Sequence, residues 1–323
     1  LHYPLRRQRQ MCIRDRGSSE RAERKMSIQI QENLETFGFV GLGSMGGPMA
    51  TNLSKSVNKL RVFDLAGTKE RAPENALCCE SLEEIAASCN TLFLSLPDGG
   101  DVIQATLELS NMKQTSCKTV IDTSTIGIDA VNQVQQVLDN SGITYLDCPV
   151  SGGQSGAKAG TLTFMVSGPE NRFRELENIL KSMSSNIFYL GEKCGQGQAM
   201  KLLNNFLSGT AMLATSEAYA FGINQGLDPE QMFKVLNVST GVNSATLDKF
   251  PKQVASQQYA AGFSNTMMSK DVTLFRESVK KAKTLTTLGE MVQDFWERFS
   301  REEPDSDFTK IYPFVEKQNL KKT

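Results

Sequence analysis

An α/β half followed by an all-helical half, the two joined by one long helix, is the fold class that this sequence predicts. Short apolar runs alternate with helical patterns from residue 37 to residue 194, which is typical of a sheet covered by helices. After residue 195 only helical patterns recur. From Gln198 to about Gly222 there is no proline and apolar residues keep helical spacing, so we expect one helix of about 25 residues and about 37 Å at the junction.

Length and composition indicate a globular protein that acts on a small molecule. The chain has 323 residues, enough for two domains, and its 39% hydrophobic and 22% charged residues are ordinary values that favour no membrane class. With 35 basic residues against 36 acidic ones, no net field attracts nucleic acid or an anionic membrane. A small molecule is therefore the expected partner.

Cysteine and histidine usage argues against a metal site. The 7 cysteines form no C-x-x-C pair and leave an odd one over, so we expect reduced thiols instead of disulfides or zinc ligands. The only histidine is His2, near the start of the chain. Proton transfer must then fall to Lys, Tyr, Cys, Asp or Glu.

Residues 1–36 are predicted to be a disordered or non-native leader outside the fold. They are rich in arginine and have no sustained apolar period, and a signal peptide would need an apolar core. The arginines allow a mitochondrial transit peptide, although Asp15, Glu20 and Glu23 count against one. The alternative is an upstream extension that precedes a start at Met26. The expected compartment is mitochondrial in the first case and cytoplasmic in the second.

A dinucleotide-binding fingerprint opens the folded part. The apolar run at 37–40 leads into Gly41-x-Gly43-x-x-Gly46 and a helical pattern, the strand, turn and helix order of a Rossmann-type domain. A second strand at 60–63 ends on Asp64, whose carboxylate can bind the adenosine ribose hydroxyls and would repel a 2′-phosphate. No arginine follows Asp64 directly, so NAD is favoured over NADP. The residues expected at the cofactor here are Gly41, Leu42, Gly43, Ser44, Met45, Gly46 and Asp64.

Further strands are expected at residues 91–96, 119–122, 143–146, 161–166 and 186–190. Ligands of doubly wound sheets bind beyond the carboxyl ends of the strands, which makes the residues after each strand candidates. Leu96 and Pro97 are one such pair. Ser124 and Thr125 are another, and they could either cap the next helix or contact the nicotinamide or its ribose.

The segment Ser151, Gly152 and Gly153 offers a second kind of site. A hydroxyl beside two residues without side chains lets several backbone N–H groups converge on an anion, which suits a substrate carboxylate. A plain flexible turn is the alternative reading of the same residues.

Residues 195–205, G-Q-G-Q-A-M-K-L-L-N-N, carry the best catalytic candidate. Helical spacing places Lys201 and Asn205 one above the other on one face, so an ammonium and an amide that can position it project together. A lysine on a helix is more often solvated surface, and only its context between the two halves favours catalysis. The helical domain is expected over residues 195–323, and its aromatic faces are expected in the core or at a subunit interface.

The sequence resembles the β-hydroxyacid dehydrogenases, and within them the 3-hydroxyisobutyrate group. The resemblance runs from about Phe37 to about Lys317 and rests on four ordered motifs, G-F-V-G-L-G-S-M-G-G-P-M-A-T-N-L, D-C-P-V-S-G-G-Q-S-G-A-K-A-G-T-L-T-F-M-V-S-G, G-Q-G-Q-A-M-K-L-L-N-N and M-S-K-D-V-T-L-F. It implies a cofactor domain, a helical domain and catalysis in the cleft between them. It also implies a homodimer or homotetramer.

Roles for individual residues follow from the resemblance. Lys201 matches the family's catalytic lysine and Asn205 its supporting asparagine, while 151–153 matches its substrate-carboxylate loop. Lys270 and Asp271 match the contacts that close over cofactor and substrate. Leu96, Pro97 and Thr125 match family cofactor positions.

Three stretches depart from the family pattern, and the last of them bears on the substrate. Cys148 stands where alanine is usual, and Asp101 stands where mammalian-like members have an asparagine near the cofactor. Residues 240–245, T-G-V-N-S-A, replace an arginine and a tryptophan of the substrate pocket, so the identity of the acid is less certain than the chemistry.

The function expected is NAD-dependent oxidation of a small 3-hydroxy acid, with 3-hydroxyisobutyrate to methylmalonate semialdehyde in valine degradation as the leading reaction. Lys201 would be the general acid/base, and burial should lower its pKa. The alternatives are an NAD(P)H-dependent reductase of glyoxylate, succinic semialdehyde or tartronate semialdehyde, and, from another class, a catalytically silent binding module.

Overall fold

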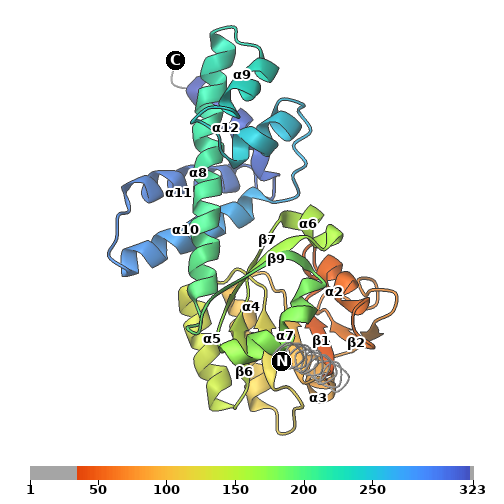
Figure 1. Cartoon of the computed structure of the whole chain (residues 1–323). Coiled ribbons are helices and arrows are strands. Elements are labelled where there is room, and N and C mark those ends of the chain that lie inside the picture. The colour runs from red at the N-terminus through yellow and green to blue at the C-terminus, as the bar shows by residue number, and fades with distance from the viewer. Residues whose placement is uncertain (1–34, 321–323) are drawn as a thin grey trace, which may run out of the picture.

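The computed structural model describes residues 35–320, a mixed sheet covered by helices with a helical part stacked on its carboxyl edge (Figure 1). The predicted leader, residues 1–36, lies outside the described residues except for Glu35 and Thr36. Glu35 forms an ion pair with Arg172, and the Thr36 amide donates to Asn90 Oδ1 at 2.8 Å.

The sheet has the strand order β3-β2-β1-β4-β5-β6-β8-β7, with β9 paired to β8. Strands β1 to β6 run parallel, while β8 is antiparallel to β6 and β7. The strands are β1 (Phe37–Val40), β2 (Leu60–Phe63), β3 (Leu77–Cys78), β4 (Thr91–Leu94), β5 (Thr119–Asp122), β6 (Thr144–Asp147), β7 (Val150–Ser151), β8 (Leu162–Ser167) and β9 (Ser184–Gly191). This is the Rossmann-type half that the sequence predicts.

The strand predictions hold, with shifts of one or two residues at some ends. The strands expected at 37–40, 60–63 and 119–122 have those bounds. The strand expected at 91–96 ends at Leu94 because the chain leaves the sheet there and the Leu96 amide turns to Ser124 Oγ, at 2.9 Å.

Helices cover both faces of the sheet and build the second half. They are α2 (Gly46–Ser54), α3 (Leu82–Ser88), α4 (Gly99–Asn111), α5 (Ile128–Asn140), α6 (Gly153–Ala159), α7 (Glu170–Lys181), α8 (Gln196–Asn224), α9 (Pro229–Leu236), α10 (Asn265–Lys281), α11 (Thr287–Glu302) and α12 (Ile311–Leu320), with a π-helix η1 (Ala245–Val254) and a 3₁₀ turn η2 (Phe308–Lys310). The π-helix was not predicted, and it contains Pro251, which has no N–H to donate.

Helix α8 joins the halves, rising from the sheet through the helical part (Figure 1). It has 29 residues, about 44 Å. It starts after Gly195, whose φ of 93° favours glycine, and it runs past the predicted end at Gly222. Gly222 lies inside the helix, and Met232 packs against it so closely that a Cβ there would lie 2.2 Å from Met232 Sδ.

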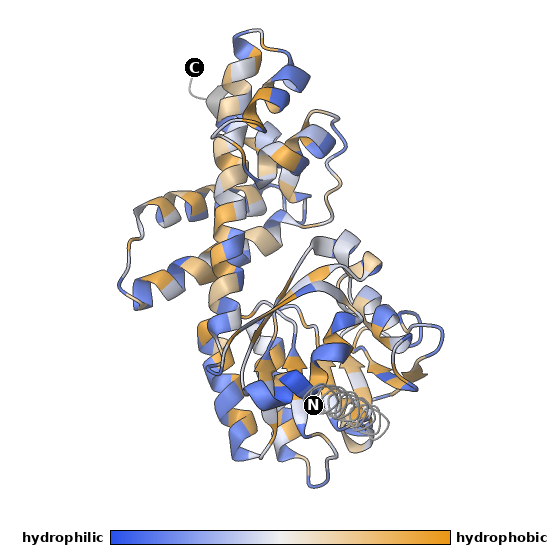
Figure 2. Ribbon diagram, viewed as in Figure 1, coloured by the Kyte–Doolittle hydropathy of each residue, from blue (hydrophilic) through white to orange (hydrophobic). Residues whose placement is uncertain are grey.

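Three hydrophobic cores stabilise the two halves. One face of the sheet packs under α2 and α7 and the other under α3, α4 and α5. In Figure 2 the covering helices are largely blue on the outside, with orange segments lying between them. The third core fills the helical half around the fully buried Trp296, whose Nε1 donates to Gly209 O at 3.4 Å.

The aromatic faces of α10 and α11 pack inward, as predicted. Phe299 is buried beside Trp296, and Phe275 stacks on Phe206 of α8 with ring centroids 4.1 Å apart.

Over the described part of the chain, the helices include none with the length and apolar character that crossing a membrane requires.

Candidate active site

The glycine turn after β1 has the geometry that its sequence predicts. A Cβ on Gly41 would lie 2.3 Å from Ser95 O, and one on Gly46 would lie 1.9 Å from Gly41 O, so both positions exclude side chains. Around Gly43 no heavy atom lies within 4 Å of the same position, and Ser44 beside it is exposed. The open space at the N-terminus of α2 suits a pyrophosphate.

Asp64 follows β2 and holds this turn. Its Oδ2 accepts a hydrogen bond from Leu42 N at 2.6 Å and its Oδ1 accepts one from Ala66 N at 2.8 Å. Each oxygen keeps one free lone pair for a ribose hydroxyl. Arg71 Nη1 lies 3.5 Å from Oδ1. This arginine stands further along the chain, so the absence of an arginine directly after Asp64 does not reveal it.

The loops after β4 and β5 meet the helical half through Lys270. Lys270 Nζ donates to Pro97 O at 3.1 Å and to Thr125 O at 2.8 Å. The cap alternative for Ser124 and Thr125 is wrong, because α5 starts after Gly127 with no side-chain cap. Pro97 and Thr125 thus border the interdomain space, where they were predicted to contact the cofactor.

Lys201 projects from the second turn of α8 and is 8% exposed. Within residues 35–320 it forms no hydrogen bond or ion pair, so its ammonium has no fixed partner. Burial lowers the pKa of Lys201, the Asp271 carboxylate opposes this shift, and the Lys270 charge adds to it. A lysine in this setting gives up its proton more readily than a solvated lysine does.

Asn205 lies one turn further along α8, but its amide bonds to Asp271 and not to Lys201. Asn205 Nδ2 donates to Asp271 Oδ2 at 2.5 Å, and its Oδ1 accepts from Asn204 Nδ2 at 3.1 Å. Asp271 Oδ1 is buried without a hydrogen-bond partner among the described residues, 3.6 Å from Lys270 Nζ. The asparagine therefore orients a carboxylate whose charge acts on Lys201.

The segment 151–153 continues β7 into α6. Gly152 and Gly153 have φ values of 130° and 62°, which side chains rarely adopt, and no heavy atom lies within 4 Å of a Cβ placed on Gly153. The loop is half-exposed and has no hydrogen bond to Lys201 in the described part of the chain. A ligand would have to bridge the two.

Two buried side chains that meet at the start of α8, Gln198 and Asp147, have no role among the sequence predictions. Gln198 is fully buried and bonds to the loop after β5, and Asp147, at the end of β6, accepts from the amides of Gly195 and Gln198. In the sequence, only their positions within two of the four family motifs pointed to a role for these side chains.

The departures from the family pattern have mild local effects. Cys148 is fully buried, as a small residue there should be, and Asp101 lies in the exposed first turn of α4, which Asp98 caps. Residues 240–245 form the turn before η1, where Asn243 Oδ1 accepts from the amides of Ala245 and Thr246.

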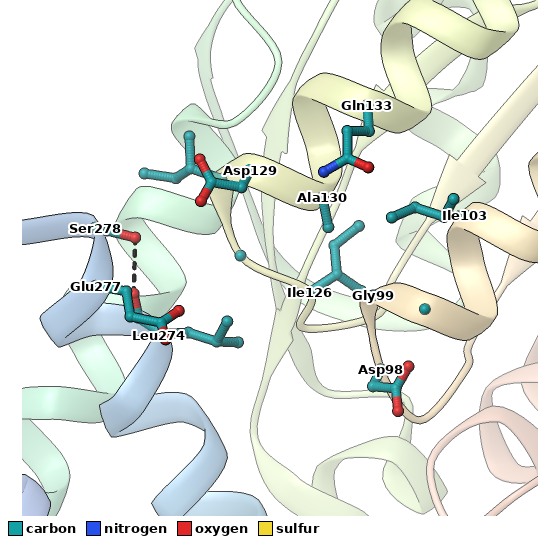
Figure 3. Close-up of a pocket in the computed structure, with 13 residues that line it drawn as sticks. Asp98, Gly99, Ile103, Ile126, Asp129, Ala130, Gln133, Leu274, Glu277 and Ser278 are labelled. Atoms are coloured by element: carbon teal, nitrogen blue, oxygen red, sulfur yellow. Dashed lines mark hydrogen bonds between the residues drawn. The ribbon is translucent and has the colours of Figure 1, made fainter. Parts of the chain in front are cut away.

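A hollow of about 310 Å³ lies between α4, α5 and α10, lined by acidic and apolar side chains that Figure 3 shows converging from these helices. Asp98, Asp129 and Glu277 belong to it, and none of its lining residues is a predicted site residue. Beside it, Asp129 forms an ion pair with Lys281 that links the two halves.

Comparisons with known proteins agree with this geometry. Residues 36–191 match the family described as the NAD binding domain of 6-phosphogluconate dehydrogenase. Residues 195–315 match the family described as NAD-binding of NADP-dependent 3-hydroxyisobutyrate dehydrogenase.

Similar proteins cover nearly the same length. The mitochondrial 3-hydroxyisobutyrate dehydrogenase of Mus musculus is 33% identical over 87% of this chain and 87% of its own. That of Pseudomonas aeruginosa is 36% identical over 80% of this chain and 90% of its own, and 2-(hydroxymethyl)glutarate dehydrogenase of Eubacterium barkeri is 33% identical over 80% and 87%. Among solved structures, Mycobacterium tuberculosis 3-hydroxyisobutyrate dehydrogenase with L-serine is 29% identical, with a TM-score of 0.78 over 87% of this chain and 99% of the other.

Proposed function

We propose, since this chain belongs to the β-hydroxyacid dehydrogenase family, that it oxidises 3-hydroxyisobutyrate to methylmalonate semialdehyde with Lys201 as general acid/base. The chain is an NAD-dependent oxidoreductase of this family, and its substrate is a small molecule. The observation that carries the proposed mechanism is a buried lysine that has no hydrogen-bond partner among residues 35–320, at the junction of the cofactor half and the helical half.

The residues at the turn fit the cofactor. The space over Gly43, the amides at the start of α2 and the free lone pairs of Asp64 suit a dinucleotide, and Pro97 and Thr125 would border its nicotinamide end. When bound, NAD accepts the hydride that leaves the carbinol carbon of the substrate. The domains we propose are the cofactor domain over 37–194 and the helical domain over 195–323.

On the substrate side, the backbone of Ser151, Gly152 and Gly153 would hold the carboxylate. Lys201 Nζ, neutral before oxidation, would accept the proton of the substrate hydroxyl as the O–H bond breaks and the carbonyl forms. In the reverse direction the charged lysine would return that proton to the alkoxide. Burial of Lys201 supports this role because it makes the neutral form accessible.

A substrate panel tests the proposal. The purified protein would be assayed for NADH formation with 3-hydroxyisobutyrate, 2-(hydroxymethyl)glutarate and L-serine, and for NADH or NADPH consumption with glyoxylate, succinic semialdehyde and tartronate semialdehyde. The highest kcat/KM with 3-hydroxyisobutyrate would support the proposal. A higher value with one of the semialdehydes or glyoxylate would favour the reductase, and no turnover of any of them would favour a silent binding module.

We also propose that the protein is a homodimer or homotetramer, because one side of α8 carries exposed apolar side chains. Met200, Leu203 and Leu207 lie at helical spacing and are 38%, 43% and 59% exposed. The compartment, mitochondrial or cytoplasmic, is likewise a proposal, and the mitochondrial relatives support the first. Imaging of the full chain with a fluorescent tag at its C-terminus separates the two.

A further inference from the structure

Gln198 lies in the first turn of α8, fully buried, and every hydrogen-bonding site of its amide is used. Nε2 donates to Ser124 O at 3.0 Å and to Asp147 Oδ1 at 2.9 Å, and Oε1 accepts from the amides of Ile126 and Gly127 at 2.9 and 3.0 Å. An amide side chain has two donor hydrogens and two acceptor lone pairs, so none is left over. The orientation of the amide is fixed, because a flipped amide would place its NH2 group against the N–H groups of Ile126 and Gly127 and its oxygen against Ser124 O and Asp147 Oδ1.

The loop that Gln198 binds is the one that borders the interdomain space. Ser124 Oγ accepts from the Leu96 amide at 2.9 Å, and the carbonyl of Thr125 accepts from Lys270. One side chain therefore connects the backbone expected beside the nicotinamide to the helix that carries Lys201. Lys201 follows Gln198 by three positions, on the same side of α8.

Asp147 completes this attachment. Its Oδ2 accepts from Gly195 N at 2.9 Å, from Gln198 N at 3.1 Å and from Ser167 Oγ at 2.9 Å. The first amides of a helix have no partner within the helix, and here a carboxylate at the end of β6 binds two of them. The helix start also lies close on the sheet, since a Cβ on Gly197 would be 2.6 Å from Met165 O.

We infer that Gln198 is a positioning residue for the reaction: its amide sets the place of Lys201 relative to the loop of Ser124 and Thr125. This inference rests on the proposed role of Lys201. If Gln198 only stabilised the fold, replacing it would lower the melting temperature and leave kcat unchanged. Small displacements of a catalytic group reduce turnover because reacting atoms must approach in a narrow range of geometry.

The experiment compares Gln198→Met with a matched control, Arg172→Met. Arg172 also makes several part-buried hydrogen bonds, to Thr119 Oγ1 and Thr91 Oγ1 at 2.8 Å each, but at the amino ends of β4 and β5, away from the site. We expect Gln198→Met to lower kcat by roughly 10- to 100-fold. It should also shift the part of the pH profile of kcat that reports the protonation of Lys201. Arg172→Met should lower the melting temperature while kcat stays within about twofold and the pH profile is unmoved.

Gln198→Glu is the second variant, in case the methionine variant does not fold. It has the same shape, but it loses the donor to Ser124 O and faces the Asp147 carboxylate, so the same loss of kcat is expected. If either folded variant has kcat within threefold of the parent and the parent pH profile, the inference is overturned. Lys201→Ala, assayed in parallel, separates the two failures: full turnover by that variant rejects the proposed mechanism itself, whereas an inactive Lys201→Ala beside an active Gln198 variant rejects the positioning role alone.

Discussion

Asn205 Nδ2 lies 2.5 Å from Asp271 Oδ2, and this hydrogen bond connects the helix that carries Lys201 to the helix that carries Lys270. Both residues are buried, and Lys270 Nζ lies 3.6 Å from the other carboxylate oxygen, Oδ1. The charge of Asp271 also acts on Lys201, raising the pKa that burial lowers.

The first prediction is that Lys201→Ala lowers kcat by roughly 10²- to 10⁴-fold, the range for loss of a general acid/base. NAD affinity should hardly change, because the turn at Gly43 and Asp64 belong to the other half. Lys201→Arg should restore little, since a guanidinium keeps its proton. Steady-state kinetics and calorimetric titration of NAD check this, and an alanine variant within a factor of three of the parent would contradict it.

A second prediction concerns pH. The proposed mechanism requires a neutral Lys201 for oxidation, so kcat/KM for oxidation should rise with pH until the lysine is deprotonated, and kcat/KM for reduction should fall over the same range. Asp271→Asn removes the charge that raises the pKa of Lys201, so the rise and the fall should both move to lower pH. Asp129→Asn, which removes an exposed carboxylate paired with Lys281, is the control and should leave both in place.

Cofactor choice is the third prediction. NAD should bind at least about tenfold tighter than NADP, about 1.4 kcal/mol, because the Asp64 carboxylate repels a 2′-phosphate. Asp64→Asn keeps an acceptor for Leu42 N, removes the charge and frees Arg71, so the preference should shrink by about tenfold or more. In Asp64→Asn with Arg71→Ala the gain in NADP affinity should largely disappear. Equal affinities of the parent for both cofactors, by fluorescence titration, would refute the prediction.

The fourth prediction concerns stability. Burial raises the pKa of Asp122 from 3.8 to about 7, so the folded protein binds a proton there more readily than the unfolded chain. The contribution of Asp122 to stability is thus full below pH 4 and lost as pH rises to about 7. Asp122→Asn should remove this part of the pH dependence, measured by urea unfolding between pH 5 and pH 8. Asp139→Asn on the exposed end of α5 is the control.

The fifth prediction tests the oligomer. Leu207→Asp places a charge in the exposed apolar side of α8 and should lower the mass measured by size exclusion with light scattering. Leu285→Asp, at a 96% exposed position between α10 and α11, is the matched control and should leave the mass unchanged. A monomeric parent would reject the proposed oligomer outright.

Much of the cofactor half could be predicted from local pattern. Buried parallel strands are continuous apolar runs, so β1, β2 and β5 had the predicted bounds. The spacing of the three glycines predicted the turn after β1, where two of them leave no room for a side chain and the third borders open space. The helix α8 ends two residues beyond the predicted end at about Gly222, and Gly222 lies inside it with Met232 packed against it. That contact involves residues ten positions apart, on two helices.

The candidate site could be predicted in its residues but not in its contacts. Lys201 and Asp271 were found from motifs, yet the bond from Asn205 to Asp271 joins residues 66 positions apart, and helical spacing alone pointed the amide at Lys201. Gln198 was passed over because glutamine has no chemistry that a spacing rule detects. Its role depends on four partners brought together by β5, β6 and α8.

The chain contains one tryptophan, and Trp296 is fully buried in the helical half, against the Gly209 segment of α8. Its emission is therefore an intrinsic optical reporter of the helical half of the molecule. Circular dichroism follows both halves, so the two signals recorded along one denaturant series would show whether α8 makes the halves unfold together. Coincident curves would mean that a single cooperative unit spans the junction.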